Sequence, residues 1–162
     1  MVADHYDVAQ ICLNGHIINS STLRFPQHDQ KYCDKCGAET IINCPSCKAD
    51  IRGYYYMDDV ISSGGEIGTP AFCHNCGKSY PWTDMKIKAA RELAQELDLS
   101  SEDKEMLTKS IDDIVSDSPR TALGATRFKK IMMKVGKEGA SALKNILVDI
   151  VSEAAKKTIW PG

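Results

Sequence analysis

The sequence has no long apolar run. Its longest unbroken runs are only a few residues, such as Ile146-Leu147-Val148, far below the roughly 18 apolar residues that a membrane span needs. The first residues, MVADHYDVAQIC, contain no basic segment followed by an apolar one, so no secretory signal is expected. With 43% hydrophobic residues and a net charge of −2, we expect a soluble, folded, cytoplasmic protein without a membrane span.

Cysteine is absent after residue 76, and all seven cysteines lie within residues 12–76. An odd number of cysteines without a secretion signal argues against a disulfide framework and favours metal binding. Charge divides near the same place: residues 1–84 hold 6 basic and 10 acidic side chains, and residues 85–162 hold 14 and 12. A chain of 162 residues suits one domain or two small ones. We therefore expect two structural units, residues 1–83 and residues 84–162.

Cysteine and histidine residues form four closely spaced pairs in the first unit. Short spacing lets two side chains of one tight turn reach the same ion, and two pairs complete the tetrahedron that zinc prefers in structural sites. The eight ligands suffice for two closed zinc sites, with no cysteine left over. The pairs are Cys12 with His16, Cys33 with Cys36, Cys44 with Cys47, and Cys73 with Cys76.

The four pairs can be grouped in three ways. The second pair can join the third, the pairs can alternate in a cross-brace, or they can combine in chain order. A partial internal repeat favours chain order, because YCDKCG at 32–37 and FCHNCG at 72–77 each place an aromatic residue, a Cys-x-x-Cys turn and a glycine in sequence. Two tandem zinc ribbons are then expected at about 12–36 and 44–76.

His16 is expected to complete the first site as its fourth donor. The alternative is a surface histidine, with the first site incomplete or completed by water. Each ribbon is too short to bury an adequate core of its own, and metal binding of about 10–16 kcal/mol substitutes for that core in small zinc domains. Four protein ligands leave no open position on an ion, so we expect two structural Zn²⁺ ions and no zinc hydrolase.

Three stretches give the sequence a family resemblance: CLNGHII, FCHNCGKSYPWT and SDSPRTALGATRFKK. Together with the double Cys-x-x-Cys pattern of residues 32–77, they resemble an uncharacterised bacterial zinc-ribbon family, a domain of unknown function. The resemblance covers nearly the full length. It supports the ligand set and a layout of ribbons followed by helices, and it implies no activity.

The rest of the sequence predicts short strands and then helices. Residues 51–61 read as β-rich, residues 62–65 as a turn, and the segment up to Phe72 as a returning strand. After Asp84 the apolar residues recur with helical period. The expected fold is small α+β: tandem ribbons with short antiparallel strands, followed by three or four α-helices in a bundle or a dimerising arm.

Specific residues mark the expected helices. The first ends near Asp98, and Ser100 caps the second. Ser118 caps the third, with Pro119 in its first turn. Glycines at 136 and 139 predict a bend or break, and the last helix includes Leu143 to Ala154.

Basic residues gather between residues 120 and 144, where Glu138 is the one acid. This stretch is able to contact phosphates, an anionic membrane surface or an acidic partner; the alternative is a solvated helix face. The candidate contact residues are Arg120, Arg127, Lys129, Lys130, Lys134 and Lys137, with Lys144 at the end of the stretch.

The leading functional hypothesis is a non-enzymatic protein whose zinc ribbons form a scaffold for a protein partner and whose helices oligomerise or dock that partner. The second is nucleic-acid binding through residues 120–144, which the net charge of −4 in residues 1–84 disfavours for the ribbons themselves. The third is an enzyme using a zinc ion or carboxylates such as Asp58 and Asp59. The sequence shows no nucleophile–base constellation and no phosphate loop, so no catalytic residue is assigned.

Overall fold

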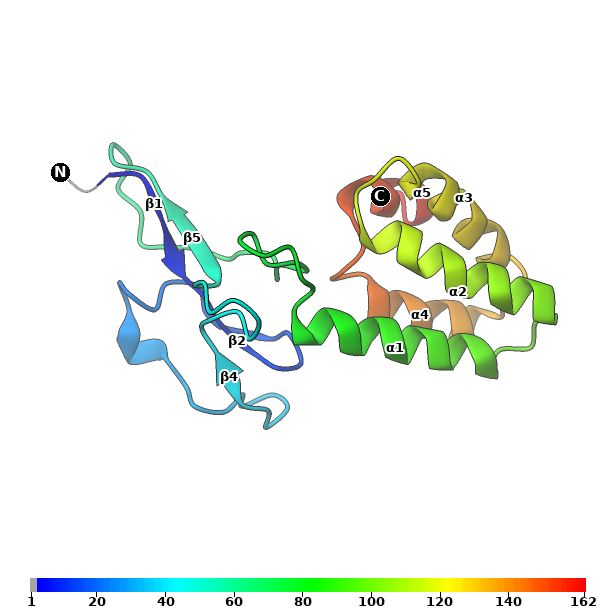
Figure 1. Cartoon of the computed structure of the whole chain (residues 1–162), viewed down its shortest axis with the longest axis horizontal. Coiled ribbons are helices and arrows are strands. Elements are labelled where there is room, and N and C mark those ends of the chain that lie inside the picture. The colour runs from blue at the N-terminus through cyan, green and yellow to red at the C-terminus, as the bar shows by residue number, and fades with distance from the viewer. Residues whose placement is uncertain (1–2) are drawn as a thin grey trace. The chain divides into compact units, whose positions relative to one another are not determined.

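The structure is a computed structural model, and it describes residues 3–162 (Figure 1). Backbone contacts divide the chain into two compact units, with the boundary between Thr83 and Asp84. We call the described residues up to 83 the cysteine unit and residues 84–162 the helical unit. The ribbon boundaries expected at 12–36 and 44–76 stay predictions.

Short strands form two small antiparallel sheets in the described part of the cysteine unit (Figure 1). In the first sheet, β1 pairs with β5 through the partners His5 with Tyr56 and Val8 with Arg52. In the second, β2 lies between β3 and β4, and all three of its residues are buried. The strands are β1 (His5–Val8), β2 (Gln10–Cys12), β3 (Ile17–Asn19), β4 (Thr40–Ile41) and β5 (Arg52–Tyr56); a short 3-10 helix, η1, spans Pro26–His28.

The core of the cysteine unit is small and adjoins the cysteines. The Tyr80 and Trp82 rings stack with centroids 4.7 Å apart, and the Trp82 indole Nε1 donates a hydrogen bond to the Pro70 carbonyl at 2.8 Å. A Cβ atom on Gly15 would lie 3.1 Å from the Cβ of Trp82, so the chain passes close to this ring. The buried apolar cluster consists of Ala9, Ile11, Cys44, Ile51, Cys73, Tyr80 and Trp82.

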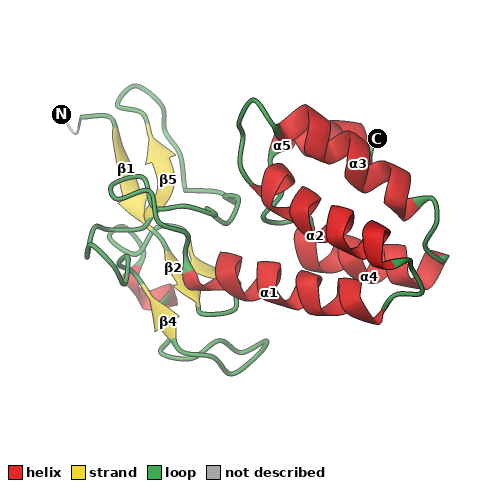
Figure 2. Cartoon of the chain, turned by 45° about the vertical axis from the view of Figure 1, so that its right-hand side comes forward, coloured by secondary structure: helices red, strands yellow, loops and turns green. Residues whose placement is uncertain are grey.

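Helices make up the second half of the chain (Figure 2). Buried aliphatic side chains at helical spacing, such as Leu107, Ile111 and Ile114 in α2, form its core. Phe128 of α3 is fully buried there and meets the Trp160 ring edge-on at 6.1 Å. The helices are α1 (Pro81–Glu96), α2 (Ser101–Val115), α3 (Thr121–Met132), α4 (Lys137–Leu147) and α5 (Glu153–Ile159).

Serine caps define two of these helices. The Ser100 hydroxyl accepts a hydrogen bond from the Asp103 N–H at 3.1 Å, which confirms the predicted cap of α2. The Ser152 hydroxyl accepts from the Ala155 N–H at 3.3 Å and caps α5. The predicted break at Gly136 is also confirmed, since this residue is the N-cap of α4.

The strand prediction after residue 51 was wrong in two respects. The β-rich segment is shorter than expected, because β5 ends at Tyr56. The returning strand towards Phe72 does not form: residues 57–70 contain no strand, and Phe72 makes only an isolated bridge with Ser79. The physical reason is that β5 finds its partner in β1, near the N-terminus, and not in the segment that follows it.

The helix prediction was right in type but wrong in number and boundaries. Five α-helices span residues 81–159, where three or four were expected. The segment expected as one last helix divides, because Ser152 caps a new helix and its N–H donates to the Ile114 carbonyl at 2.9 Å instead of continuing α4. The predicted cap of the third helix at Ser118 was wrong, since α3 begins at Thr121 and its N-cap residue is Arg120, without a side-chain cap hydrogen bond. Pro119 therefore precedes the helix and is not in its first turn.

Within residues 3–162, no helix has both the length and the apolar character that crossing a membrane requires.

Candidate metal centres

The structure brings the first two ligand pairs together. Cys12, His16, Cys33 and Cys36 each offer one donor atom, and the four atoms all lie within 4.8 Å of one another. The Cys12 Sγ lies 3.4 Å from His16 Nδ1 and 3.7 Å from Cys36 Sγ. His16 Nδ1 is also 3.6 Å from Cys33 Sγ. The histidine therefore faces the cluster through Nδ1, at the position of a fourth donor.

The third and fourth pairs form a second cluster. Cys44, Cys47, Cys73 and Cys76 again place their donor atoms within 4.8 Å of one another. Contacts join the two turns: Cys44 Sγ lies 3.8 Å from Cys76 Sγ, and Cys47 Sγ lies 3.7 Å from Cys73 Sγ. The pairs are thus combined in chain order, and the geometry does not match the cross-brace.

These distances match the edges of a metal-centred tetrahedron. Metal–sulfur bonds of about 2.3 Å in a regular tetrahedron give sulfur–sulfur edges of about 3.8 Å, and one metal–nitrogen bond of about 2.05 Å gives nitrogen–sulfur edges of about 3.6 Å. The observed edges are 3.7 and 3.8 Å between sulfurs and 3.4 and 3.6 Å from Nδ1 to sulfur. All seven cysteines are free thiols. The residues therefore fit two four-coordinate metal ions.

The same local turn holds each Cys-x-x-Cys pair. In each, the N–H of the first cysteine donates to the carbonyl five residues later, and the N–H four residues later donates back to the carbonyl of that cysteine. This turn directs both thiols to one side and needs no side chain beyond the cysteines. The paired bonds are Cys33 N to Ala38 O (2.8 Å) with Gly37 N to Cys33 O (2.7 Å), Cys44 N to Ala49 O (2.8 Å) with Lys48 N to Cys44 O (2.9 Å), and Cys73 N to Lys78 O (2.8 Å) with Gly77 N to Cys73 O (2.9 Å).

The fourth residue after the first cysteine has a left-handed backbone in all three turns. Gly37 and Gly77 have φ values of +76° and +75°, which glycine adopts without steric cost. The turn of Cys44 and Cys47 has Lys48 at this position, with φ +68°. Lys48 is the one non-glycine residue with positive φ among residues 3–162. The turn geometry thus persists where the sequence lacks the favoured glycine.

Amide groups support the cysteines, and the sequence interpretation missed them. The Asn75 Nδ2 donates to the Cys47 Sγ at 3.4 Å and so reaches from one turn of the second cluster to the other. In the first cluster the Asn14 side chain hydrogen-bonds Cys36 and lowers its pKa. Both asparagines stand two residues after a ligand cysteine. An asparagine two residues after a ligand cysteine was therefore the feature of the sequence that could have predicted this support.

Backbone donors favour the thiolate form of two ligands. The hydrogen bond from the Ala38 N–H is the largest cause that lowers the pKa of Cys36 to about 6. The Cys76 N–H likewise lowers the pKa of Cys73 to about 6. Because a thiol must lose its proton to bind a metal, these bonds favour metal binding by Cys36 and Cys73, whereas burial raises the pKa of Cys12. Tyr80 responds in the opposite sense: burial and the neighbouring Cys73 raise the pKa of its hydroxyl.

Each cluster has a buried side and an exposed side. Cys12 and Cys33 are buried, whereas Cys36 is exposed. In the second cluster, Cys44 and Cys73 are buried and Cys76 is exposed. The exposed thiols are the ones a chelator would reach first.

The basic candidates lie on the helical unit, and two of them are already paired. The Arg120 guanidinium donates to Asp113 at 3.0 and 3.3 Å, and the Lys134 ammonium lies 3.0 Å from Asp103. Arg127 lines a groove with Glu102 and Glu105. The remaining candidates are exposed: Lys129 and Lys130 in the last turn of α3, and Lys137 at the start of α4.

One of three comparisons with known proteins found a match. Neither the curated proteins nor the solved structures gave a match. A family profile described as "Uncharacterized protein conserved in bacteria (DUF2321)" matches residues 5–159. That description names no activity, and the two four-ligand clusters are consistent with a double zinc ribbon. Because the match covers nearly the whole chain, the protein belongs to this bacterial family.

Proposed function

We propose that this protein is a non-catalytic zinc protein that binds two structural Zn²⁺ ions and serves as a scaffold for protein–protein interaction. The observation that carries the proposal is the pair of four-donor clusters whose edges fit a tetrahedral metal ion. Zinc is favoured because the first cluster mixes one imidazole with three thiolates, a common donor set of structural zinc sites. Tetrahedral sulfur sites also suit iron, which is the main competitor for the second cluster.

A structural role follows from the number of donors. Four protein ligands fill the tetrahedron, so no position is left for the water or substrate that a catalytic zinc needs. The Asp58 and Asp59 carboxylates belong to neither cluster, and His74, which lies between the ligands Cys73 and Cys76 in sequence, also stands outside both. The absence of an open position is our reason for proposing a protein without enzymatic activity.

The interaction role is supported by apolar side chains that the helical unit leaves exposed. Monomeric proteins expose single apolar residues routinely, and we infer that a partner or a second copy covers the most exposed of these. Met133 is the most exposed of them, at 82%. The set is Met85, Met106, Leu123 and Met133.

Metal analysis of the intact chain tests the metal part of the proposal. We expect two zinc ions per chain after purification without added metal, measured by elemental analysis. His16→Ala is expected to weaken one site, and Cys47→Ser the other. His74→Ala is the matched control, because His74 lies between two ligands in sequence but outside the cluster. A single zinc per chain, or iron in place of zinc, would contradict the proposal.

Mass measurement tests the interaction part. Light scattering of the zinc-loaded chain is expected to give a mass above that of the monomer, and Met133→Glu is expected to lower it. Arg127→Glu serves as a charge control on the same unit. A monomer at every concentration, with no protein partner bound, would leave the scaffold role without support.

Nucleic-acid binding is the second candidate, and the exposed Lys129 and Lys130 favour it. No ion pair of these two lysines occurs among residues 3–162. Against it, two zinc ions (+4) and seven thiolates (−7) take the net charge of residues 1–84 from −4 to −7. A gel shift at low salt that Lys129→Glu with Lys130→Glu abolishes would support this candidate, and no shift at low salt would remove it.

A further inference from the structure

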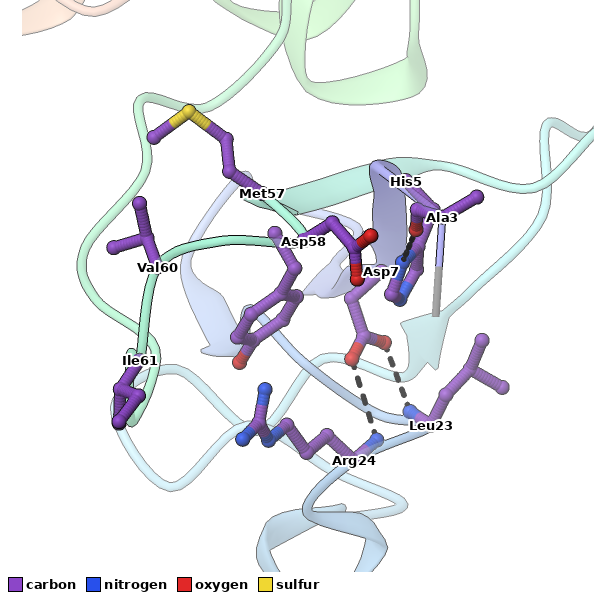
Figure 3. A pocket seen from close by; sticks show the side chains of 10 residues that line it. Ala3, His5, Asp7, Leu23, Arg24, Met57, Asp58, Val60 and Ile61 are labelled. Atoms are coloured by element: carbon purple, nitrogen blue, oxygen red, sulfur yellow. Dashed lines mark hydrogen bonds between the residues drawn. The ribbon is translucent and has the colours of Figure 1, made fainter. Parts of the chain in front are cut away.

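A cavity of about 530 Å³ opens on the cysteine unit, away from either metal cluster's ligands (Figure 3). Its volume lies in the range of small-molecule sites, about 300–1,000 Å³. The proposed scaffold role leaves this cavity without a function. The side chains that decide its chemistry are Leu23, Arg24, Met57, Asp58, Val60 and Ile61.

Four of those side chains are exposed and apolar; Met57, Val60 and Ile61 lie on one side of the cavity and Leu23 on the opposite side (Figure 3). Ile61 is fully exposed, and Leu23 is 68% exposed. Met57 and Val60 are each about half exposed, at 51% and 49%. Scattered apolar residues need no explanation, but three on one side of a single hollow favour a ligand with an apolar part.

The floor of the cavity is held in place by polar contacts. The buried Asp7 carboxylate accepts hydrogen bonds from the backbone N–H groups of Leu23 at 2.9 Å and Arg24 at 3.2 Å (Figure 3). The buried Tyr56 and Ser21 hydroxyls are hydrogen-bonded to each other at 2.9 Å. These bonds fix the loop that carries Leu23 and Arg24, so this side of the cavity is in place before a ligand arrives.

One cation in the cavity lacks an anionic partner. The Arg24 guanidinium lies over the Tyr56 ring, 4.6 Å from its centroid, and 5.9 Å from that of Phe25. No carboxylate of residues 3–162 forms an ion pair with it. Guanidinium presents a fork of N–H donors that suits carboxylate and phosphate oxygens.

Two carboxylates, Asp7 and Asp58, and one guanidinium, that of Arg24, line the cavity. The Asp7 carboxylate is buried and is hydrogen-bonded by the backbone N–H groups of Val8, Leu23 and Arg24, so the exposed charges that a ligand meets are those of Arg24 and Asp58, and these two are separated. Figure 3 shows the Arg24 guanidinium on the side towards Ile61, while the Asp58 carboxylate lies at the other end, near His5. An anionic head group is attracted at the Arg24 end and repelled at the Asp58 end. A ligand with one anionic head and an apolar body matches this order.

We propose that the cavity binds a small amphipathic monoanion, an acyl-chain carboxylate whose head group pairs with Arg24. Its chain lies along Val60 and Ile61, on the side of the cavity towards which the Arg24 guanidinium points, and these contacts bury apolar surface that the free protein exposes. The function is separate from the metal clusters, so the proposal stands or falls without the scaffold role.

The test measures binding of octanoate to the full-length, zinc-loaded chain by calorimetry and by NMR shift changes. Two probes of the same length separate charge from apolar contact: neutral 1-octanol and cationic octylamine. We expect octanoate to bind roughly tenfold or more tightly than 1-octanol, because a charge-assisted hydrogen bond forms with Arg24. Octylamine is expected to bind most weakly of the three.

Two variants locate the site. Arg24→Met keeps the alkyl stem over Tyr56 and removes the charge, so octanoate binding is expected to fall roughly tenfold while 1-octanol binding is unchanged. Arg52→Met is the matched control, because Arg52 also lies over a tyrosine ring, 4.5 Å from that of Tyr6, but outside the cavity. Ile61→Asp is expected to abolish octanoate binding without harming the fold, since this side chain is fully exposed.

Several results would overturn the proposal. Equal octanoate affinity in Arg24→Met and the unaltered chain would remove the head-group contact. Tighter binding of octylamine than of octanoate would assign the charge selectivity to Asp58 instead. Loss of binding in Met133→Asp, a substitution of an exposed residue of the helical unit, but not in Ile61→Asp would place the site elsewhere.

Discussion

The two units of this chain are stabilised in different ways. In the helical unit, fifteen buried apolar residues form one cluster that contains no cysteine. In the described part of the cysteine unit, the corresponding cluster has seven buried residues, and two of these, Cys44 and Cys73, are also candidate metal ligands. A helical core of that size can fold by burial alone, whereas the smaller cluster includes the metal site in its own packing.

The smaller buried core of the cysteine unit explains why all seven cysteines lie in that unit. Strands of two to five residues bury little surface, and a two-stranded sheet is marginal in water. Under the proposed metal binding, turns tied to a common ion would supply the missing cross-links. Helices of seven to sixteen residues with apolar faces need no such support. The comparison therefore makes separate expectations for each unit.

Metal removal is expected to have the largest effect, and only on the cysteine unit. Chelation should withdraw about 10–16 kcal/mol of binding free energy per site and unfold the strands. Trp82 is fully buried in this unit, so its emission in a Trp160→Phe background reports the loss. Far-UV circular dichroism is expected to retain the helical signal. Unchanged Trp82 emission after both metals have been removed would contradict the claim that the cysteine unit needs metal to fold.

The reciprocal change targets the helical core. Phe128→Ala removes a fully buried ring and is expected to lower the free energy of unfolding of that unit by about 3–5 kcal/mol. The measurement is chemical denaturation followed by far-UV circular dichroism. Elemental analysis of the same variant should still find two metal ions per chain. Loss of metal along with helix stability would show that the two units are not independent.

The turn glycines provide a finer test of the cysteine unit. Gly37→Ala is expected to destabilise it by about 1–2 kcal/mol, since φ is +76° and no neighbouring atom lies within 4 Å of the added Cβ, so the cost is purely conformational. Lys48→Gly is expected to stabilise the equivalent turn by about 1 kcal/mol. Denaturation monitored by Trp82 emission measures both. If Gly37→Ala and Lys48→Gly changed the free energy of unfolding in the same direction, the two turns would not share one backbone geometry.

The smallest expected effect concerns a helix cap. Ser100→Ala removes the hydroxyl that accepts from the Asp103 N–H and should destabilise the helical unit by about 1 kcal/mol. Ser100→Gly should cost only a few tenths of a kcal/mol. Thermal melting followed by circular dichroism compares the two variants. If Ser100→Ala changed the metal affinity of the cysteine unit instead, the two units would not be stabilised separately.

Local signals in the sequence predicted much of this structure. The spacing of the cysteines and the repeat at 32–37 and 72–77 favoured the grouping in chain order that the structure has. Ser100 and Gly136 marked helix ends correctly because capping depends on neighbouring residues only. Such short-range chemistry is readable from one sequence.

Long-range contacts were not readable. The pairing of β1 with β5 joins Tyr6 to Tyr55, and neither segment alone indicates its partner. The division of the last helix depends on the Ser152 N–H finding the Ile114 carbonyl, a contact that helical periodicity does not contain. The support that Asn75 gives to Cys47 was missed because it too crosses from one turn to another.

The most direct test of the central claim is the cadmium NMR spectrum of the intact chain after metal replacement. Cadmium resonances respond to the number of bound sulfurs, so the two proposed sites are distinguishable. We expect two resonances of equal intensity, one from three thiolates with an imidazole and one from four thiolates, with His16→Cys moving the first towards the second. A single resonance, or two resonances whose chemical shifts do not change in His16→Cys, would contradict two separate sites of these compositions.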